Sequence, residues 1–285
     1  MRVLVLGATG MLGNAVFKVL SGSPTLSVTG TVRSAKGIES FDKSIKGRLI
    51  AGVDVLDQDS LIDVFSQCKP EVVINCVGLI KQLSSAKDPL STLPINAMLP
   101  HRLSKLCALT SARLVHISTD CVFSGRKGMY KEEDISDAED LYGKSKYIGE
   151  VNDQPHVVTL RTSIIGHELN SQASLIDWFL SQSGTVKGFS KAIFSGLPTV
   201  ELARVIADFV IPRPELQGLY HVSAEPIDKL SLLRQVAKTY QKEINIIPDE
   251  QLEIDRSLDS SRFRTAAGYA PPSWADLIEA MRAQR

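Results

Sequence analysis

Short apolar runs alternate with segments of helical periodicity through the first half of the chain. The apolar runs lie at 2–6, 26–32, 47–51, 72–77, 113–118 and 156–161. Segments with the spacing of a helix separate most of them, near 11–21, 58–67, 89–110 and 140–153. Short apolar strands that alternate with helices are typical of a parallel sheet covered on both faces. The pattern predicts an α/β fold built on a Rossmann-type doubly wound parallel sheet.

The alternation breaks down beyond residue 166. We therefore expect a Rossmann domain over 1–166 and, over 167–285, mostly a smaller C-terminal lobe. A helix over 199–211, with Thr199 as its cap and Glu201 in its first turn, is expected to pack back on the sheet. Glycines and charged residues at 124–140 indicate a surface loop.

The composition indicates a globular protein without a charged macromolecular partner. The chain has 285 residues, of which 44% are hydrophobic and 22% charged, and 32 Lys and Arg balance 32 Asp and Glu. A net charge of zero gives no reason to expect a nucleic-acid or anionic membrane surface. No apolar run reaches the ~18 residues that span a bilayer. The N-terminus enters an apolar strand directly, which is not the pattern of a signal peptide.

Cysteine and histidine spacing predicts neither a metal site nor a disulfide scaffold. The four cysteines include no CxxC pair, and the five histidines include no HxxxH or HExxH spacing. A reduced protein in the cytoplasm fits this usage best.

A glycine-rich junction, Gly7-Ala8-Thr9-Gly10-Met11-Leu12-Gly13, joins the first apolar run to the first helix. Its GxxGxxG spacing supplies a tight turn, close backbone approach to a pyrophosphate and close helix–strand packing. Glycines are commonly turn formers only, but this pattern follows a strand and opens a helix. It predicts dinucleotide binding at Gly7, Thr9, Gly10, Met11 and Leu12.

The ends of the second and third strands bear on the choice of cofactor. A carboxylate after the second strand would bind the adenosine ribose diol, whereas this chain has Arg33 and Ser34 there. The donor fork of arginine suits a 2′-phosphate, so NADPH is predicted and NADH is the alternative. Asp54 and Val55 follow the third strand, where a carboxylate reaches the adenine amino group. Capping of the helix that begins near Ser60 is an equally plausible role for Asp54.

The fourth and fifth strands end in small or hydroxyl residues. Cys76, Val77 and Gly78 would let a cofactor lie across the sheet edge, or could simply belong to the core. Ser118 and Thr119 end the fifth strand, at the edge where ligands bind in such sheets. Either hydroxyl could donate to a substrate carbonyl oxygen, or instead bind the local backbone.

Tyr142 and Lys146 are spaced by one helical turn in Tyr142-Gly143-Lys144-Ser145-Lys146. An ammonium beside a phenol favours the phenolate and lowers its pKa from about 10 towards the range useful for proton transfer. The alternative is a solvated helix face, because two-residue patterns recur by chance.

Together these motifs resemble the extended short-chain dehydrogenase/reductase superfamily, and within it the dTDP-4-dehydrorhamnose reductase family and related nucleotide-sugar 4-ketoreductases. Further segments in the order typical of the family are Ser118-Thr119-Asp120-Cys121-Val122-Phe123-Ser124-Gly125, Gly149-Glu150, Leu160-Arg161-Thr162-Ser163, Gly196-Leu197-Pro198-Thr199, Gly218-Leu219-Tyr220-His221, Arg256-Ser257-Leu258-Asp259 and Pro272-Ser273-Trp274.

The resemblance implies a mechanism. A hydride from NADPH would reach a ketone carbon, Tyr142 would give a proton to the developing alkoxide, and Thr119 would hydrogen-bond the same oxygen. Lys146 would hold the nicotinamide ribose and keep the tyrosine acidic. The implied substrate is a nucleotide-diphospho-4-keto-6-deoxy sugar, and a homodimer is common in the superfamily.

Two departures concern the substrate. Cys121 stands where the family often has an aromatic residue, and Ile164 where it tends to have tryptophan. Both positions lie near the substrate in the family, so a sugar other than the rhamnose precursor is expected. Related dehydratases have a glutamate at the position of Cys121, so dehydration is not expected.

The C-terminal region offers charged candidates for the diphosphate of a sugar nucleotide, although each alone is more typical of a solvated surface: Lys187, Lys191, Arg256 and Arg262. Trp178 and Phe179 fit the core or a subunit interface better than a base-stacking platform. Two other functions stay open. The family includes a non-catalytic dinucleotide-binding regulatory subunit, the partner of a synthase that makes a methyltransferase substrate, and the superfamily includes nucleotide-sugar epimerases.

Overall fold

A computed structural model of the chain describes residues 1–80, 87–169 and 174–284. Its main feature is a seven-stranded parallel sheet in the order β11-β6-β5-β4-β1-β2-β3. The strands are β1 (Arg2–Leu6), β2 (Ser27–Val32), β3 (Leu49–Ala51), β4 (Val72–Asn75), β5 (Arg113–Thr119), β6 (Val157–Thr162) and β11 (Gly218–His221). The chain order reverses between β1 and β4, which makes this the switch point of a doubly wound sheet. The predicted fold class is confirmed.

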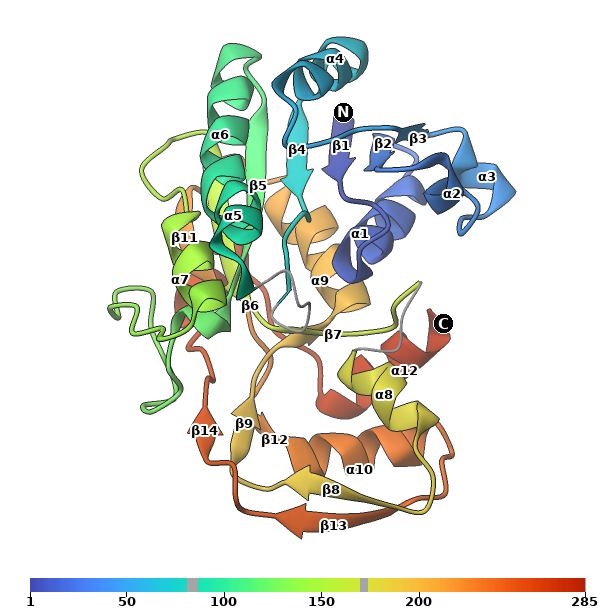
Figure 1. Ribbon diagram of the computed structural model, residues 1–285, viewed down its shortest axis with the longest axis vertical. Coiled ribbons are helices and arrows are strands. Elements are labelled where there is room, and N and C mark those ends of the chain that lie inside the picture. Colours follow the sequence, from blue (N-terminus) through green and yellow to red (C-terminus); the bar gives the residue numbers. More distant parts are fainter. Residues whose placement is uncertain (81–86, 170–173, 285) are drawn as a thin grey trace.

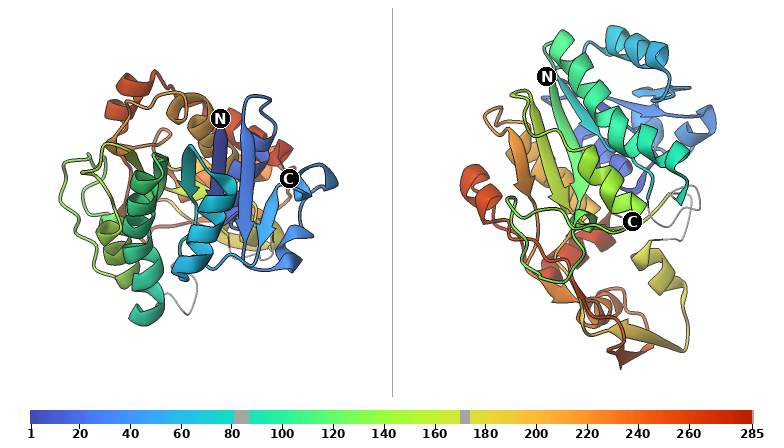
Figure 2. Two further views of the ribbon diagram at one scale, coloured as in Figure 1. Left: turned by 90° about the horizontal axis from the view of Figure 1, so that it is seen from above. Right: turned by 60° about the vertical axis from the view of Figure 1, so that its left-hand side comes forward.

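Helices cover both faces of this sheet (Figures 1 and 2). Alternate residues of β1 point to opposite faces, so Val3 and Val5 belong to one apolar cluster and Leu4 and Leu6 to another. On the first face lie α1 (Met11–Ser21), α9 (Thr199–Val205) and η4 (Ile206–Val210); on the second lie α4 (Gln58–Cys68) and α6 (Leu99–Leu109).

Shorter helices complete the large unit. They are α2 (Ala35–Ile38) and α3 (Lys43–Lys46) near β3, α5 (Pro89–Thr92) and the π-helical η2 (Leu93–Met98) before α6, the 3₁₀ turn η3 (Asp120–Val122) after β5, and α7 (Leu141–Ile148).

A smaller lobe lies below the carboxyl edge of the large sheet (Figure 1). Two small sheets build it, one ordered β12-β9-β14 and the other β13-β8. Their strands are β8 (Thr185–Phe189), β9 (Ala192–Phe194), β12 (Ile227–Asp228), β13 (Asn245–Asp249) and β14 (Ile254–Asp255), and the helices α8 (Leu175–Ser181) and α10 (Lys229–Thr239) pack with them. A two-stranded link joins β7 (Ile164–Ile165) and β10 (Leu197–Pro198), and α11 (Ser261–Ala267) and α12 (Trp274–Ala283) end the chain.

The chain returns to the large unit several times after residue 166. Besides β11, helix α9 packs against α1, and α12 contacts both α9 and α10. Helix α9 begins at Thr199 itself, with Pro198 at the cap position and no side-chain cap. The prediction of Thr199 as the cap is therefore wrong, since a proline at the end of β10 sets the start of the helix. Glu201 does lie in the first turn.

No helix in the described ranges is long and apolar enough to span a bilayer. Nor do His, Cys, Asp and Glu side chains gather in threes as a metal site would need, within the same ranges. Phe179 is buried in the core as predicted, whereas Trp178 on the same helix is 37% exposed.

Candidate active site

The glycine-rich junction forms the turn that the sequence predicts. Gly7 has a φ of +81°, which favours glycine, and its amide donates to the Thr31 hydroxyl oxygen at 3.2 Å. A Cβ added to Gly13 would lie 2.1 Å from the Gly7 carbonyl oxygen, so only glycine lets α1 pack this closely. Gly10 is exposed at the N-cap of α1, where amides and the helix dipole favour an anion. The turn thus suits a pyrophosphate. Contacts between the dinucleotide and the other residues of the turn, Thr9, Met11 and Leu12, stay a prediction.

The end of β2 lies against this turn. The Ala8 amide donates to the Thr31 carbonyl at 2.9 Å, and Arg33 and Ser34 follow as exposed residues. Helix α2 is also close, because a Cβ on Gly37 would lie 2.9 Å from Thr9 Cγ2. Among the ion pairs of the described chain none involves Arg33. A donor fork is therefore available next to the turn, as a 2′-phosphate requires.

Asp54 does not cap a helix. Asp57 occupies the N-cap of α4 and accepts from the Asp59 amide, whereas Asp54 Oδ1 accepts from the Leu56 amide at 2.9 Å and closes a turn. The prediction that Asp54 could cap this helix is therefore wrong, because Asp57 is the residue that caps it. Adenine contacts of Asp54 and Val55 stay predictions.

The end of β4 reaches the glycine turn. A Cβ on Gly7 would lie 2.9 Å from Val77 Cγ2 and 3.5 Å from the Cys76 carbonyl carbon. Asn75 Oδ1 accepts from the Val77 amide at 3.1 Å and fixes this segment. Cys76, Val77 and Gly78 thus line the same carboxyl edge as the glycine turn, which agrees with their predicted place.

Helix α7 carries Tyr142 and Lys146, and its position is fixed by close packing. Asp140 caps it by accepting from the Gly143 amide at 2.8 Å. A Cβ on Gly143 would lie 2.2 Å from the Cys121 carbonyl oxygen, so glycine lets α7 lie directly against η3. Lys146 is 6% exposed, and its Nζ donates to the Ile117 carbonyl of β5 at 2.7 Å. Lys146 therefore faces the end of β5 and not solvent, and Tyr142 lies one turn before it as a partly exposed residue.

The pKa values of the pair differ from the sequence prediction. Burial lowers the pKa of Lys146 to about 8, and the charge of Glu150 opposes this shift. Burial also raises the pKa of Tyr142 above its ordinary value, and the neighbouring acidic groups of Cys121 and Asp120 add to the rise. The expectation that the neighbouring ammonium lowers the tyrosine pKa is wrong for the protein alone. Lys146 donates to the Ile117 carbonyl and is not among the groups that shift the Tyr142 pKa, so desolvation of the phenolate is the largest effect.

Thr119 and Ser118 point in different directions. The Thr119 hydroxyl lies next to the Tyr142 side chain and opposes in part the rise in the pKa of Tyr142, and Thr119 Oγ1 accepts from the Cys121 amide at 3.2 Å. Ser118 Oγ is buried and donates to Glu150 Oε1 at 2.7 Å. Successive residues of a strand face opposite sides, which explains the split. The Ser118 hydroxyl is thus held by the Glu150 carboxylate and not by the local backbone, whereas Thr119 accepts from the local backbone and also lies next to Tyr142.

Cys121 and Arg256 meet on the lobe side of Tyr142. Arg256 Nη1 lies 3.7 Å from Cys121 Sγ, and its Nε donates to the Phe123 carbonyl at 2.8 Å. Burial raises the pKa of the Cys121 thiol to about 12, so the thiol is neutral and unreactive at neutral pH. Ile164 belongs to β7, which pairs with β10. Cys121 and Arg256 thus lie beside the candidate acid, as expected for substrate contacts.

The other three predicted cations are engaged elsewhere. Lys187 Nζ pairs with the buried carboxylate of Asp249 at 3.1 Å, and Lys191 forms an exposed pair with Glu250 at 3.2 Å, both in the small lobe. The Arg262 guanidinium lies 5.1 Å from the centre of the Tyr220 ring, on β11. The structure does not bring these three to Tyr142, and a diphosphate contact for Lys187 has no support from its position.

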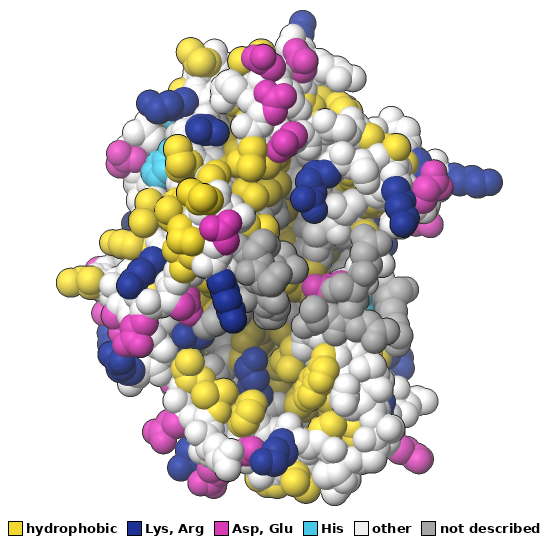
Figure 3. All heavy atoms as spheres, viewed as in Figure 1, with side chains coloured by type: hydrophobic (Ala, Val, Ile, Leu, Met, Phe, Trp, Pro, Cys, Tyr) yellow, Lys and Arg dark blue, Asp and Glu magenta, His cyan; other side chains and the backbone are white. Residues whose placement is uncertain are grey.

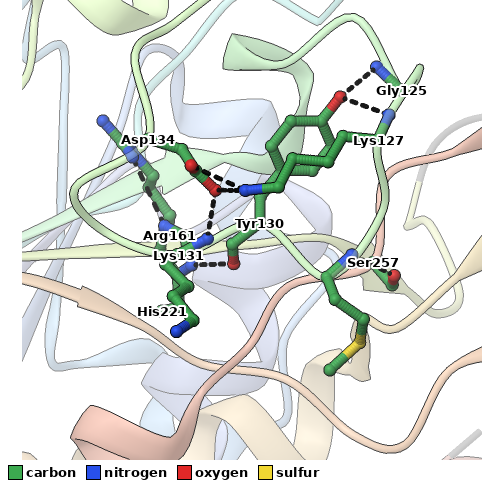
Figure 4. A network of polar contacts seen from close by, with 9 residues as sticks. Gly125, Lys127, Tyr130, Lys131, Asp134, Arg161, His221 and Ser257 are labelled. Atoms are coloured by element: carbon green, nitrogen blue, oxygen red, sulfur yellow. Dashed lines mark hydrogen bonds and ion pairs between the residues drawn. The ribbon is translucent and has the colours of Figure 1, made fainter.

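The predicted loop at 124–140 is held firmly by polar contacts (Figure 4). Tyr130 OH accepts from the amides of Gly125 and Lys127, both at 3.1 Å, and its ring stacks on Phe123 with centroids 4.1 Å apart. The Tyr130 amide donates to the Ser257 carbonyl at 2.9 Å. This loop therefore fixes the segment that presents Arg256 to the site.

Sequence reasoning missed two residues around the pair. Lys229 is half-buried, and its charge acts on Asp120 and Cys121. Asn96 ties the segment after Gly78 to α7, since its Oδ1 accepts from the Leu79 amide at 2.9 Å and its Nδ2 donates to Ser145 Oγ at 3.3 Å. Neither residue belongs to a local motif, so spacing alone gave no signal for them.

Comparison with known proteins identifies the family. The sequence pattern described as "RmlD substrate binding domain" matches residues 1–284. The chain belongs to this family. The predicted resemblance to dTDP-4-dehydrorhamnose reductases within the short-chain dehydrogenase/reductase superfamily is thereby confirmed.

Two relatives show different activities. The chain is 26% identical over 259 residues to methionine adenosyltransferase 2 subunit beta of Rattus norvegicus, covering 84% of this chain and 72% of the relative. It is 25% identical over 234 residues to dTDP-4-dehydrorhamnose reductase of Aggregatibacter actinomycetemcomitans, covering 79% and 74%.

Solved structures share the fold along the whole chain. A dTDP-4-dehydrorhamnose reductase from Bacillus anthracis in complex with NADP has a TM-score of 0.79 at 21% identity, covering 99% of both chains. A hypothetical dTDP-4-dehydrorhamnose reductase from Sulfolobus tokodaii has a TM-score of 0.75 at 25% identity, covering 96% of this chain and 98% of the other.

Proposed function

We propose that the protein is an NADPH-dependent reductase that converts the C4 ketone of a nucleotide-diphospho-4-keto-6-deoxy sugar to an alcohol. The observation that carries the proposal is the close packing of α7 against η3 at the end of β5, which places Tyr142 beside Thr119 and Cys121, with buried Lys146 hydrogen-bonded to the Ile117 carbonyl one turn later. Family membership and the named relatives support the substrate class. Nucleotide-sugar and polysaccharide synthesis is the proposed setting.

The residues present fit NADPH. The glycine turn leaves room for a pyrophosphate, because a Cβ at Gly7 or Gly13 would clash with neighbouring atoms. Beside this turn, Arg33 offers an exposed guanidinium. Helix α1 begins there with its amides towards the pyrophosphate position. A relative in the family was solved with NADP. NADH remains the alternative cofactor, because exposed Arg33 is compatible with both.

Each polar side chain has a distinct role in the proposed reaction. NADPH supplies the hydride. Tyr142 gives its hydroxyl proton to the alkoxide that forms at the ketone oxygen, and Thr119 donates a hydrogen bond to that oxygen, which stabilises its developing charge. Lys146 in its ammonium form binds the nicotinamide ribose. Arg256 and Lys229, which approach from the small lobe, meet the anionic part of the sugar nucleotide.

The decisive experiment measures NADPH oxidation with a panel of nucleotide-diphospho-4-keto sugars. Tyr142→Phe removes only the proton donor, so we expect a loss of ~10²–10⁴-fold in kcat, with NADPH binding retained in a fluorescence titration. Tyr147→Phe is the matched control, because Tyr147 is on the same helix and 45% exposed. If no sugar leads to NADPH oxidation, or if Tyr142→Phe is as active as the control, the reductase proposal fails.

A second candidate is a dinucleotide-binding regulatory subunit without catalysis. It is favoured by the similarity to methionine adenosyltransferase 2 subunit beta. Binding of NADPH without oxidation of it, together with altered kinetics of a methionine adenosyltransferase catalytic subunit on mixing, would support this function. A nucleotide-sugar epimerase would instead interconvert sugars with no net NADPH consumption.

We also propose a homodimer in the cytoplasm. Figure 3 shows hydrophobic side chains gathered over α5, η2, α6 and α7. The large exposed members of this face are Leu90, Met98, Leu109, Tyr147 and Ile148. Patches of this kind commonly mark protein contacts, and the four unpaired cysteines suit a reducing compartment. Light scattering after size exclusion should give twice the chain mass of 31.1 kDa, and cell fractionation tests the compartment.

A further inference from the structure

Asp120 is a buried carboxylate in the site to which the proposed reaction gives no role. It is the first residue of η3 and only 6% exposed. Its Oδ1 accepts a hydrogen bond from Thr119 Oγ1 at 3.1 Å. Within the described chain it forms no ion pair, although the charges of Arg256 and Lys229 act on it from the small lobe. The protonation state of this buried carboxylate therefore decides whether Thr119 donates to it or accepts from it.

The Thr119 hydroxyl has one proton and two lone pairs, and the structure shows where they go when Asp120 is ionised. The proton points to Asp120, and one lone pair accepts from the Cys121 amide at 3.2 Å. The Thr119 proton is therefore directed away from a ketone oxygen that would lie beside Tyr142.

A proton on Asp120 reverses this hydrogen bond. The carboxylic acid becomes a donor, and Thr119 Oγ1 is its acceptor. Since Asp120 and the Cys121 amide then both donate to Thr119 Oγ1, the Thr119 proton is no longer held by Asp120 and is available to a substrate oxygen. A neutral Asp120 also removes a negative charge that makes Tyr142 a weaker acid.

We propose that Asp120 is a positioning residue for the reduction, and that its protonated form frees the Thr119 hydroxyl to donate to the ketone oxygen. The inference rests on the proposed reductase function. The burial of Asp120 agrees with the inference, because burial raises the pKa of Asp120 above its ordinary value. The rise is opposed in part by the charges of Arg256 and Lys229 and by the hydrogen bonds from Thr119 and Cys121.

The kinetic test compares the pH profile of kcat for the native chain with that of Asp120→Asn. Both substrates are kept saturating and the range stays below pH 8, because Lys146 titrates near pH 8. The asparagine amide donates to Thr119 at every pH. We expect the native kcat to fall as pH rises through the Asp120 titration, and the variant to hold a flat rate within about threefold of the native acid plateau. Asp120→Ala lacks a donor and should lose about tenfold at the plateau, with KM little changed.

Asp140→Asn is the matched control. Asp140 is a second carboxylate whose charge raises the pKa of Tyr142, but its side chain caps α7 by accepting from the Gly143 amide at 2.8 Å. Asparagine also caps helices. The control should therefore keep the native fall in kcat. The inference is overturned if Asp120→Asn keeps that fall, or if it loses more than a hundredfold at the acid plateau.

A second measurement needs no substrate, so it separates this inference from the proposed function. Carboxyl ¹³C NMR of aspartate-labelled protein, with Asp120→Asn to assign the resonance, follows the titration directly. We expect a midpoint above the ordinary value of about 3.9, and a higher one in Thr119→Val, which lacks the hydrogen bond that stabilises the anion. A native midpoint at or below the ordinary value would overturn the inference even in an active enzyme.

Discussion

The ion pair between Glu150 and Arg161 behind the active site is almost wholly buried, so breaking it should be costly. The two side chains are 1% and 2% exposed. Arg161 Nε and Nη2 donate to the two carboxylate oxygens at 2.7 Å each, and Ser118 Oγ donates to Oε1 at 2.7 Å. Glu150 ends the turn after α7 and Arg161 lies on β6, so the pair fixes the catalytic helix to the sheet.

Glu150→Gln keeps the shape but removes the countercharge. One amide oxygen can still accept, whereas the amide nitrogen meets an Arg161 nitrogen that is also a donor, and a buried guanidinium is left unpaired. Removing one partner of a buried pair costs ~3–5 kcal/mol. The total free energy of unfolding of a protein is only ~5–15 kcal/mol. We therefore expect the unfolding temperature to fall on the order of 10 °C.

Thermal and urea unfolding followed by circular dichroism measure this loss. Glu279→Gln is the control, because Glu279 is 55% exposed and pairs with Arg282 at 2.8 Å; an exposed pair contributes ~0.2–1 kcal/mol. The double variant Glu150→Leu with Arg161→Met replaces both charges by apolar groups and should recover at least half of the loss. The reasoning is refuted if Glu150→Gln unfolds within about 1 kcal/mol of the control.

Three further predictions follow from the cofactor side of the site. The pKa of Lys146 is about 8, so its ammonium is lost as pH rises through that value. NADPH affinity should therefore weaken above pH 8, and calorimetric titration of Lys146→Met should show weak binding without this dependence. Arg33→Ala should weaken NADPH binding by about 10–100-fold, as expected for a hydrogen bond to a charged group, and leave NADH binding unchanged; equal losses for both cofactors would contradict the assignment. Gly13→Ala places a Cβ 2.1 Å from the Gly7 carbonyl oxygen, so it should destabilise the fold by ~1–3 kcal/mol and abolish cofactor binding. Gly47→Ala, where a Cβ would meet nothing within 4 Å, is its control and should leave the unfolding temperature unchanged or higher.

The sequence was most informative where function depends on local backbone structure. The expected apolar runs coincide with six of the seven strands of the large sheet to within a few residues, because strands buried on both faces must be apolar throughout. The glycine turn was predictable for a similar reason, since Gly7 needs a positive φ and Gly13 a close approach that other residues forbid. Parallel topology then places the ends of β4 and β5 at one edge, which brings Thr119 near Tyr142.

Features that depend on tertiary contacts were not predictable from the pattern. Lys229 reaches Asp120 only because the small lobe folds under the carboxyl edge, and Arg262 leaves the site because α11 packs beside β11. The acidity of Tyr142 is a matter of desolvation, which a one-turn spacing cannot show. The Thr199 cap failed because Pro198 ends the preceding strand.

The candidate site has two halves, one on the large unit and one on the small lobe. Under the proposed function, the large unit holds the reacting groups and the small lobe contacts the rest of the substrate. Thr119, Tyr142 and Lys146 lie on β5 and α7, which belong to the large unit, whereas Arg256 and Lys229 come from segments of the small lobe. Cys121 lies at the boundary and contacts Arg256. Under the proposed function, we expect a change at the lobe side to alter which sugar nucleotide is held without moving Tyr142. Because Cys121 lies on that boundary, we expect its departure from the family pattern to affect substrate choice and not the reaction.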